Sequence, residues 1–306
     1  MKTLFKVIVG ALCITSIVAA IAYISIEETE KYSEIEDDGN RLGPGTTATY
    51  SYESSAGDEE ISGTATYSIL GINPGGKLYK LSYDLQDSEG DYPVDDRIRL
   101  TNDESVETTS TGTGGVKTIF GNLRSPYVEY YSSGTLYRDY YNPYNGLLYK
   151  TESQDTTVEL ISLDANWYSE SSYEFSSVLG PRYTYELTGT VDGNEVSGDY
   201  TETIVAEGSS GTYWYRQTFT YESYTQTTYG LVQESSSDMT YDRNESIETV
   251  DGEKDLSVMV KNEDSRVTEY YVDESSLIIY RIDITDDTSE FVINYQYKDT
   301  DQTILA

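Results

Sequence analysis

The sequence predicts an all-β protein with two homologous antiparallel β domains behind an N-terminal transmembrane or signal helix. Three observations predict this class: a tyrosine-rich composition, apolar residues at every second position, and landmarks that occur twice in the same order. Of 306 residues, 32 are tyrosine, against 5 phenylalanine and 2 tryptophan. Tyrosine and threonine favour strands that are packed on one face and wet on the other. Each domain is therefore expected to be a curved open sheet, as in a half-barrel, or a small sandwich.

Residues 1–26 are the first element, and they form either a signal anchor or a signal peptide. Lys2 and Lys6 precede an apolar run that extends from Val7 to Ile26. A run of about 20 apolar residues can cross a bilayer, and basic residues before it orient the following chain outward. Ala20-Ile21-Ala22 matches a signal-peptidase site, so cleavage is the alternative. Either way, the body of the protein is expected outside the cytoplasm, anchored in the cell membrane or secreted.

The landmarks divide the rest of the chain into an acidic linker (27–41), a first β domain (42–165), a second linker (166–178) and a second β domain (179–306). Leu42-Gly43-Pro44 recurs as Leu179-Gly180-Pro181. Further pairs follow in the same order: Ile61-Ser62-Gly63 with Val196-Ser197-Gly198, Ile69 with Ile204, Gly76 with Gly211, Glu104–Thr108 with Glu245–Thr249, and Tyr149-Lys150 with Tyr280-Arg281. The spacing drifts by a few residues, as insertions in loops produce.

Strands are predicted where apolar residues alternate with polar ones. Tyr79, Leu81, Tyr83 and Leu85 alternate with Lys80, Ser82 and Asp84, and segments 215–221, 278–284 and 291–297 follow the same rule. A period of two predicts half-buried antiparallel strands. The turns between strands are expected at Gly75-Gly76, Asn145-Gly146, Asp192-Gly193 and Asp251-Gly252. No amphipathic helix is predicted beyond the N-terminal segment.

Two hairpins resemble a recurring hairpin of the lipoprotein-carrier-like half-barrels. In Glu269–Asp273 followed by Leu277–Arg281, a strand ends in Asp, a short turn follows, and the next strand opens with an apolar run and a base. Tyr140–Pro143 followed by Gly146–Lys150 is similar. The resemblance implies a curved sheet around an apolar cavity, in proteins that bind lipids or lipopeptides or act as sensor domains. Such families usually cover the sheet with a helix, which this sequence does not predict.

The composition excludes several classes of function. The chain has no histidine and one cysteine, so it has no Ser-His-Asp set, no His-ligated zinc or haem, no intrachain disulfide and no iron–sulfur cluster. It has 20 basic against 54 acidic residues, a net charge of −34, which argues against nucleic acid as a partner. An acid-rich surface is typical of halophilic proteins, because it stays hydrated at high salt. No cofactor is expected.

Aromatic residues are the candidates for ligand binding. Tyr130, Tyr131, Tyr140 and Tyr141 belong to a dense tyrosine run in the first domain, and Trp214 stands between two tyrosines in the second. Exposed rings stack on ligands or anchor partner proteins. The alternative is that these rings form cross-strand ladders over a thin core.

The acidic and amide residues offer weaker candidates. No metal site is predicted; Asp87, Glu89 and Asp91 are the weak candidates, because hard cations take several oxygen ligands from acidic loops. Their spacing does not fit the EF-hand. No pair among the carboxylates stands out as catalytic. Asn244-Glu245-Ser246 is an N-glycosylation acceptor, which is expected on a loop.

Together these observations predict an exported, membrane-tethered, non-enzymatic surface or envelope protein that binds a lipid-like or other apolar ligand. The alternatives are a structural or adhesive cell-surface protein and, third, an extracellular carboxylate-based hydrolase. The expected partners are the membrane, through the N-terminal helix, and a lipid or a surface protein. Inward-facing apolar residues around a void would favour the first function, and a filled core would favour the second. A cleft with convergent carboxylates of shifted pKa would favour the hydrolase.

Overall fold

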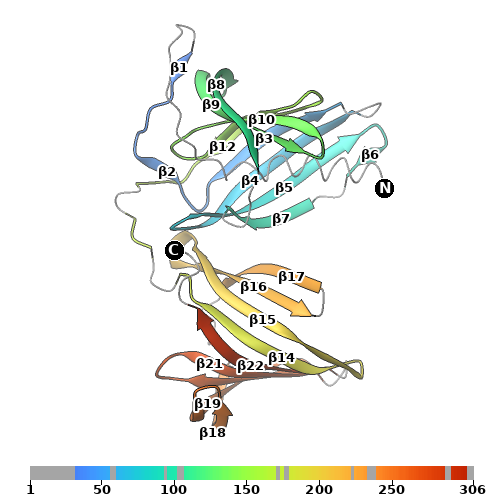
Figure 1. Ribbon diagram of the computed structural model, residues 1–306, viewed down its shortest axis with the longest axis vertical. Coiled ribbons are helices and arrows are strands. Elements are labelled where there is room, and N and C mark those ends of the chain that lie inside the picture. Colours follow the sequence, from blue (N-terminus) through green and yellow to red (C-terminus); the bar gives the residue numbers. More distant parts are fainter. Residues whose placement is uncertain are drawn as a thin grey trace. The chain divides into compact units, whose positions relative to one another are not determined.

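The computed structural model describes residues 32–55, 60–92, 95–101, 107–169, 173–175, 179–221, 224–232, 239–286 and 291–301. These residues form an all-β protein, as predicted (Figure 1), in which the short 3-10 turn η4 (Ser209–Gly211) accompanies the strands. The predicted N-terminal helix (1–26) lies outside the described residues. In the described ranges no helix is long and apolar enough to span a membrane. The chain divides into two compact units, one within Met1–Phe175 and Glu207–Gly211, the other within Ser176–Ala206 and Thr212–Ala306.

Unit 1 is an antiparallel sheet in the order β7-β5-β4-β3-β12-β11-β10-β9-β8. These strands are β3 (Thr47–Ser54), β4 (Ile61–Asn73), β5 (Gly76–Asp87), β7 (Asp95–Leu100), β8 (Thr108–Thr118), β9 (Gly121–Ser132), β10 (Thr135–Tyr141), β11 (Leu148–Glu152) and β12 (Thr156–Asp164). Short strands complete it: β1 (Ser33–Glu34) runs parallel to β9, β6 (Gly90–Asp91) pairs with β5, and β2 (Asn40–Leu42) pairs with β13 (Trp167–Ser169). One continuous sheet fits the open-sheet alternative better than a sandwich.

Unit 2 follows the same plan, in the order β17-β16-β15-β14-β22-β21-β20-β19-β18. Its strands are β14 (Arg182–Val191), β15 (Asn194–Glu207), β16 (Tyr213–Tyr221), β17 (Tyr224–Val232), β18 (Met239–Thr249), β19 (Gly252–Glu263), β20 (Arg266–Asp273), β21 (Ile278–Asp286) and β22 (Phe291–Asp301). In both units the first and last long strands lie side by side, β3 with β12 and β14 with β22.

The pairing registers of the two units match residue by residue. Thr47 pairs with Ser68 in unit 1 and Arg182 pairs with Thr203 in unit 2, so both partners are displaced by 135 residues. The same displacement relates two backbone hydrogen bonds, from Gly45 N to Ile69 O (2.8 Å) and from Gly180 N to Ile204 O (3.0 Å). Each position in these hairpins of unit 2 therefore has a defined counterpart in unit 1.

Two β-bulges also occupy matching positions. Ile161 is skipped in the pairing of β12 with β3, and Lys298, 137 residues later, is skipped in the pairing of β22 with β14. Tyr149 is skipped between β10 and β11, and Tyr280, 131 residues later, between β20 and β21. Bulges are specific features of a sheet, because each one bends a strand at one position. Descent of both units from one duplicated ancestor stays a prediction.

The register corrects one predicted pair of landmarks. Gly114 pairs with Ser125 in unit 1, and Glu245 pairs with Leu256 in unit 2, so Glu245 is the counterpart of Gly114. The expected match of Glu104 with Glu245 is therefore wrong, and Glu104 itself lies outside the described residues. Short acidic segments recur by chance in a chain with this composition, whereas hydrogen-bonded pairs define positions.

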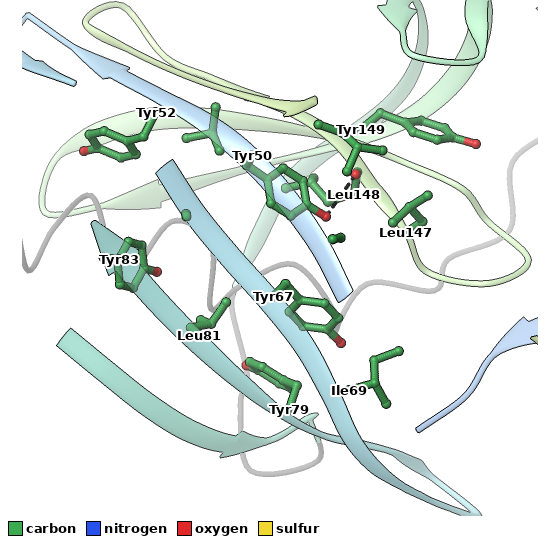
Figure 2. Packing of buried hydrophobic residues seen from close by; sticks show 14 of the residues in the cluster. Tyr50, Tyr52, Tyr67, Ile69, Tyr79, Leu81, Tyr83, Leu147, Leu148 and Tyr149 are labelled. Carbon is green, nitrogen blue, oxygen red and sulfur yellow. Dashed lines mark hydrogen bonds between the residues drawn. The ribbon is translucent and has the colours of Figure 1, made fainter. Parts of the chain in front are cut away.

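The core of unit 1 confirms the predicted alternation in β5. Tyr79, Leu81, Tyr83 and Leu85 are all buried, and Figure 2 shows the first three beside Tyr67. The rings of Tyr67 and Tyr79 lie 5.0 Å apart. We call this side of the sheet the Tyr50 face; its members include Ala48, Tyr50 and Tyr52 of β3, Ala65 and Tyr67 of β4, and Val158 and Leu160 of β12. The predicted turns at 145–146 and 192–193 lie between strands, and those at 75–76 and 251–252 lead into strands, since Gly76 opens β5 and Gly252 opens β19.

Candidate functional site

The counterpart of the Tyr50 face in unit 2 is chemically different. We call it the Tyr185 face; its members are Tyr183, Tyr185 and Leu187 of β14, Tyr200 and Glu202 of β15, Tyr270 of β20, and Tyr295 and Tyr297 of β22. The register puts Tyr183 at the position of Ala48 and Tyr200 at the position of Ala65. Two small side chains of unit 1 are therefore replaced by rings in unit 2. The same register puts Glu202 at the position of Tyr67.

The rings of the Tyr185 face touch one another. Tyr185 lies 5.7 Å from Tyr200 and 6.0 Å from Tyr297, and Tyr200 lies 5.0 Å from Tyr295, measured between ring centroids. All three contacts are tilted or edge-on, the arrangement that aromatic quadrupoles prefer. The strands thus present a continuous aromatic surface built from side chains two residues apart on each strand.

Glu202 is the acidic member of this aromatic surface. Its Oε2 accepts a hydrogen bond from the Tyr200 hydroxyl at 2.5 Å and another from Gln217 Nε2 at 3.0 Å. The side chain is half-buried, and no Lys or Arg in the described part of unit 2 forms an ion pair with it. Burial raises the pKa of Tyr185 and Tyr200, and the charge of Glu202 raises both pKa values further. The carboxylate therefore acts electrostatically on the rings around it.

Several hydroxyl groups of this face have no protein partner. Those of Tyr183, Tyr185, Tyr270 and Tyr295 form no hydrogen bond with any described residue. Tyr183, Tyr270 and Tyr295 are half-buried, whereas Tyr185 is 5% exposed. The face thus combines a buried centre at Tyr185, Leu187 and Tyr297 with half-buried tyrosines and one half-buried carboxylate around it. This combination suits a ligand with an apolar surface and a hydrogen-bonding or cationic group.

Unit 1 also has an acidic residue of note, and this one is buried. Asp139 of β10 is 1% exposed, and its Oδ1 accepts hydrogen bonds from Thr151 Oγ1 at 2.7 Å and from the Tyr130 hydroxyl at 3.4 Å. Its Oδ2 and the buried hydroxyl of Tyr141 have no partner. Burial raises the pKa of Asp139 to about 7, against the hydrogen bonds from Thr151 and Tyr130, which lower it. A carboxyl with this pKa carries a proton in a large share of molecules at neutral pH.

Lys77 is an enclosed base in the same unit. Its Nζ donates a hydrogen bond to the carbonyl of Asn145 at 2.7 Å and lies beside a cavity of about 10 Å³ lined by Leu42, Tyr50 and Tyr67. A cavity of this size holds at most one water molecule. Lys77 as a whole residue is half-buried. Burial lowers the pKa of Lys77 to about 8, and the charge of Arg41 adds to this effect.

Replacing Lys77 with methionine is expected to stabilise the protein by about 1–3 kcal/mol at pH 7, because burying a poorly paired charge costs free energy. The folded pKa of about 8 lies below the ordinary 10.5, so this cost is present below pH 8 and fades as the pH rises towards 10.5. Urea unfolding at pH 7 and pH 10 measures the change. Lys80→Met, on the same strand but half-exposed and paired with Asp96, is the control and should not stabilise. An advantage for Lys77→Met that grows above pH 8 would contradict the assignment.

The four predicted tyrosines of unit 1 do not form one site. Tyr130 is buried in a cross-strand stack with Tyr137 (ring centroids 5.7 Å apart), and Tyr141 is buried on the same side of the sheet. Tyr140 lies on the opposite side, between Arg138 and Glu152. Tyr131 is 61% exposed. Trp214 is half-buried on β16 of unit 2.

The acidic loop is held by hydrogen bonds within the protein, and the glycosylation acceptor lies in a strand. Asp87 Oδ1 accepts hydrogen bonds from the backbone of Glu89 (2.7 Å) and Gly90 (3.1 Å), and its Oδ2 accepts one from Tyr92. Of the residues that the structure describes, no group of three or more acids or cysteines could hold a metal ion. Asn244 is exposed but lies in strand β18, paired with Ser257. The prediction of a loop at Asn244 is therefore wrong. The hydrophilic composition of β18 hid its pairing with β19 in the sequence.

Comparisons with known proteins give no family. No family model matches the chain, and no curated protein matches it. Among solved structures, MucB in complex with MucA(peri) is 7% identical over 83% of this chain and 89% of that chain, with a TM-score of 0.27. The MucA/MucB complex of Pseudomonas aeruginosa is 6% identical over 84% of this chain and 88% of that chain, with a TM-score of 0.27. A DUF3598-family protein of unknown function from Nostoc punctiforme is 12% identical over 83% and 96%, with a TM-score of 0.18. These TM-scores are too low to assign a fold or a function.

Sequence reasoning missed Glu202 and the tyrosines around it. The available signal was the spacing: Tyr183 and Tyr185, Tyr200 and Glu202, and Tyr295 and Tyr297 are each two residues apart. Side chains at this spacing share one face of a strand. The sequence does not show that β15, β14 and β22 are neighbours, and only that order brings the three pairs together.

Proposed function

We propose that this chain is an exported, non-enzymatic envelope protein, tethered to the membrane by its N-terminal segment, whose unit 2 binds a lipid-like ligand with a cationic head group. The observation that carries the proposal is Glu202. This half-buried carboxylate lies among half-buried tyrosines, and it has no basic partner in the described part of the chain. The Tyr185 face is the proposed binding surface.

The chemistry of the Tyr185 face favours an organic ammonium group. The π-face of a tyrosine attracts a cation, and an adjacent carboxylate adds a direct charge interaction. A carboxylate that is removed from water costs free energy unless it is paired. A ligand cation beside Glu202 would supply that pair. The net charge of −34 also draws cations to the protein from solution.

The rings supply the contact with the apolar part of the ligand. Tyr183 and Tyr200 are half-buried in unit 2, whereas Ala48 and Ala65, their counterparts, are fully packed in unit 1. The cavity beside Tyr50 is the size of one water molecule. We therefore propose one ligand for each chain, held by unit 2, and not one ligand for each unit.

Choline titrated into the full-length chain tests the proposal, with tyrosine fluorescence or NMR shifts as the readout. Choline is expected to bind more tightly than 3,3-dimethyl-1-butanol, its uncharged isostere. Glu202→Gln keeps the acceptor for Tyr200 and Gln217 but removes the charge. We expect it to weaken choline binding roughly tenfold and to leave the isostere unaffected.

Asp199→Asn is the matched control. Asp199 lies on the same strand as Glu202 but on the opposite side of the sheet, where it pairs with Lys298 at 2.9 Å. This variant changes the net charge by the same amount and should bind choline like the wild type. Equal binding of choline and its isostere, or equal weakening by the two variants, would contradict the proposal.

A further inference from the structure

The side of unit 2 opposite the Tyr185 face is hollowed. One hollow of about 570 Å³ is lined mainly by polar residues, Glu186, Thr188, Asn294 and Gln296 among them, and Tyr295 of the Tyr185 face borders it. A second, of about 600 Å³, is lined by Arg182 and Thr184 of β14, by Asp199 and Thr201 of β15, and by the end of β22 from Lys298 to Thr300. We call the two hollows together the polar trough.

The two hollows share no lining residue, but they lie at successive positions along β14 and β22. Thr184 pairs with Asp299, Glu186 with Gln296, and Thr188 with Asn294, so the trough follows β14 and β22 in register. The stretch of β14 from Arg182 to Thr188 extends for about 20 Å at the usual rise of a strand. The trough is therefore long enough for an extended ligand and not only for a single small molecule.

Four neutral polar side chains of the trough are uncommitted. Those of Thr184, Thr188, Asn294 and Gln296 form no hydrogen bond with any residue that the structure describes. Glu186 is exposed, and its charge acts on Lys298 without a hydrogen bond between them. Amide, hydroxyl and carboxylate groups are thus available in the first hollow and at Thr184, whereas Asp199 and Lys298 in the second hollow pair with each other at 2.9 Å.

The matching positions of unit 1 are occupied within the fold. Gln296 corresponds to Glu159, whose carboxylate pairs with Lys150 at 3.1 Å. Glu186 corresponds to Ser51, whose hydroxyl donates to the carbonyl of Glu159 at 3.4 Å. Strand β8 of unit 1 also packs against β11 and β12. In unit 2 the matching strand, β18, lines the first hollow through Ile247 and Glu248 and leaves it open.

These observations restrict the kind of ligand. β14 and β22 are each paired on both sides, so their backbone groups are committed and no peptide strand can be added there. Recognition must use side chains alone. Amides, hydroxyls and carboxylates are the groups that pair with the hydroxyls of a sugar. Both acidic and basic residues line the trough, Arg281 and Lys298 among the latter, so no single ligand charge is favoured. We propose that the polar trough binds an extended, neutral glycan.

A panel of neutral tetrasaccharides of different linkage, offered to the full-length chain, tests this proposal. Saturation-transfer NMR identifies a binder, and calorimetry measures its affinity. We expect at least one tetrasaccharide to bind, and the double variant Asn294→Ala/Gln296→Ala to lose at least tenfold in affinity. Thr188→Trp, which fills the first hollow without removing an amide, should also lose binding.

Two variants serve as controls. Glu159→Ala alters the matching position of unit 1 and should bind the glycan like the wild type. Glu202→Gln, on the opposite side of unit 2, should also keep glycan binding, so this proposal and the proposed ammonium site can fail separately. The proposal is overturned if no neutral tetrasaccharide binds. It is also overturned if the folded double variant and Thr188→Trp both bind as tightly as the wild type.

Discussion

Replacing Asp139 with asparagine is expected to stabilise the protein by about 4 kcal/mol at pH 8 and to leave its stability unchanged below pH 4. Asp139 is 1% exposed, and its Oδ2 has no hydrogen-bond partner. Burial raises its pKa to about 7, so the folded chain favours the protonated form. Asparagine is uncharged at every pH and has nearly the same shape. It can accept the same hydrogen bond from Thr151, which lies 2.7 Å from Oδ1.

The sign of the pH dependence follows from that raised pKa. Between the ordinary pKa of 3.8 and the folded value of about 7, the folded chain holds a proton at Asp139 that the unfolded chain has lost. The free energy that Asp139 contributes to folding therefore becomes less favourable as the pH rises from 3.8 to about 7. Above pH 7 this contribution is constant. Other carboxylates have their own pH dependence, so the quantity to measure is the difference between wild type and variant.

Urea unfolding at several pH values between 3.5 and 8 measures this difference. It should grow through the window and level off near pH 7. Asp199→Asn, at an exposed ion-paired position, is the control and should show no such growth. A difference that does not vary with pH would mean that Asp139 is ionised and stabilised in the folded protein.

Local structure in this chain could be predicted because its causes are local. The alternation around Leu81 places every second side chain on one face of a strand, whatever the strand pairs with. Glycine at 193 and at 252 has a positive φ of 76° and 94°, which is why the turn dipeptides there were recognisable. These signals depend on residues that are at most a few positions apart.

The order of the strands could not be predicted in the same way. β3 lies beside β12 with Tyr50 opposite Leu160, a pairing between residues far apart in the sequence. No local signal specifies that partner. The candidate residues were therefore selected by density along the sequence, as with Tyr130 and Tyr140, which lie on opposite sides of one sheet. Glu202 was overlooked because its tyrosine neighbours come from other strands.

The comparison of matching positions explains how one plan can give two different surfaces. Where unit 1 has Ala48, Ala65 and Tyr67, unit 2 has Tyr183, Tyr200 and Glu202. Small residues allow the Tyr50 ring to pack and its hydroxyl to donate to the carbonyl of Leu148 at 3.2 Å, as Figure 2 shows. Large residues and an acid keep the matching face of unit 2 partly open. Unit 1 thus has the packing of a structural core, and unit 2 carries the surfaces proposed for binding.

Replacing Gly63 with alanine is expected to destabilise the protein by at least about 3 kcal/mol. A Cβ at this position of β4 would lie 2.1 Å from the carbonyl oxygen of Asp84 on β5. Both atoms belong to paired backbones, so neither can move without separating the two strands. The matching glycine of unit 2, Gly198, has the same problem, because its Cβ would lie 2.2 Å from the carbonyl oxygen of Thr220. Gly198→Ala should therefore cost about as much as Gly63→Ala.

Gly121→Ala separates close approach from backbone strain. Gly121 has a φ of +107°, but a Cβ there would meet no atom within 4 Å. Its replacement should cost only the strain of an unfavourable φ, about 1–2 kcal/mol. Urea unfolding of the three variants then distinguishes two explanations. If close strand approach determines the cost, Gly63→Ala and Gly198→Ala are alike and both exceed Gly121→Ala. If strain alone determines it, Gly63→Ala resembles Gly121→Ala, and Gly198, whose φ is not in the left-handed region, tolerates alanine. The second pattern would mean that glycine stands at the matching positions 63 and 198 for unrelated reasons, which would weaken the case for a common origin of the two units.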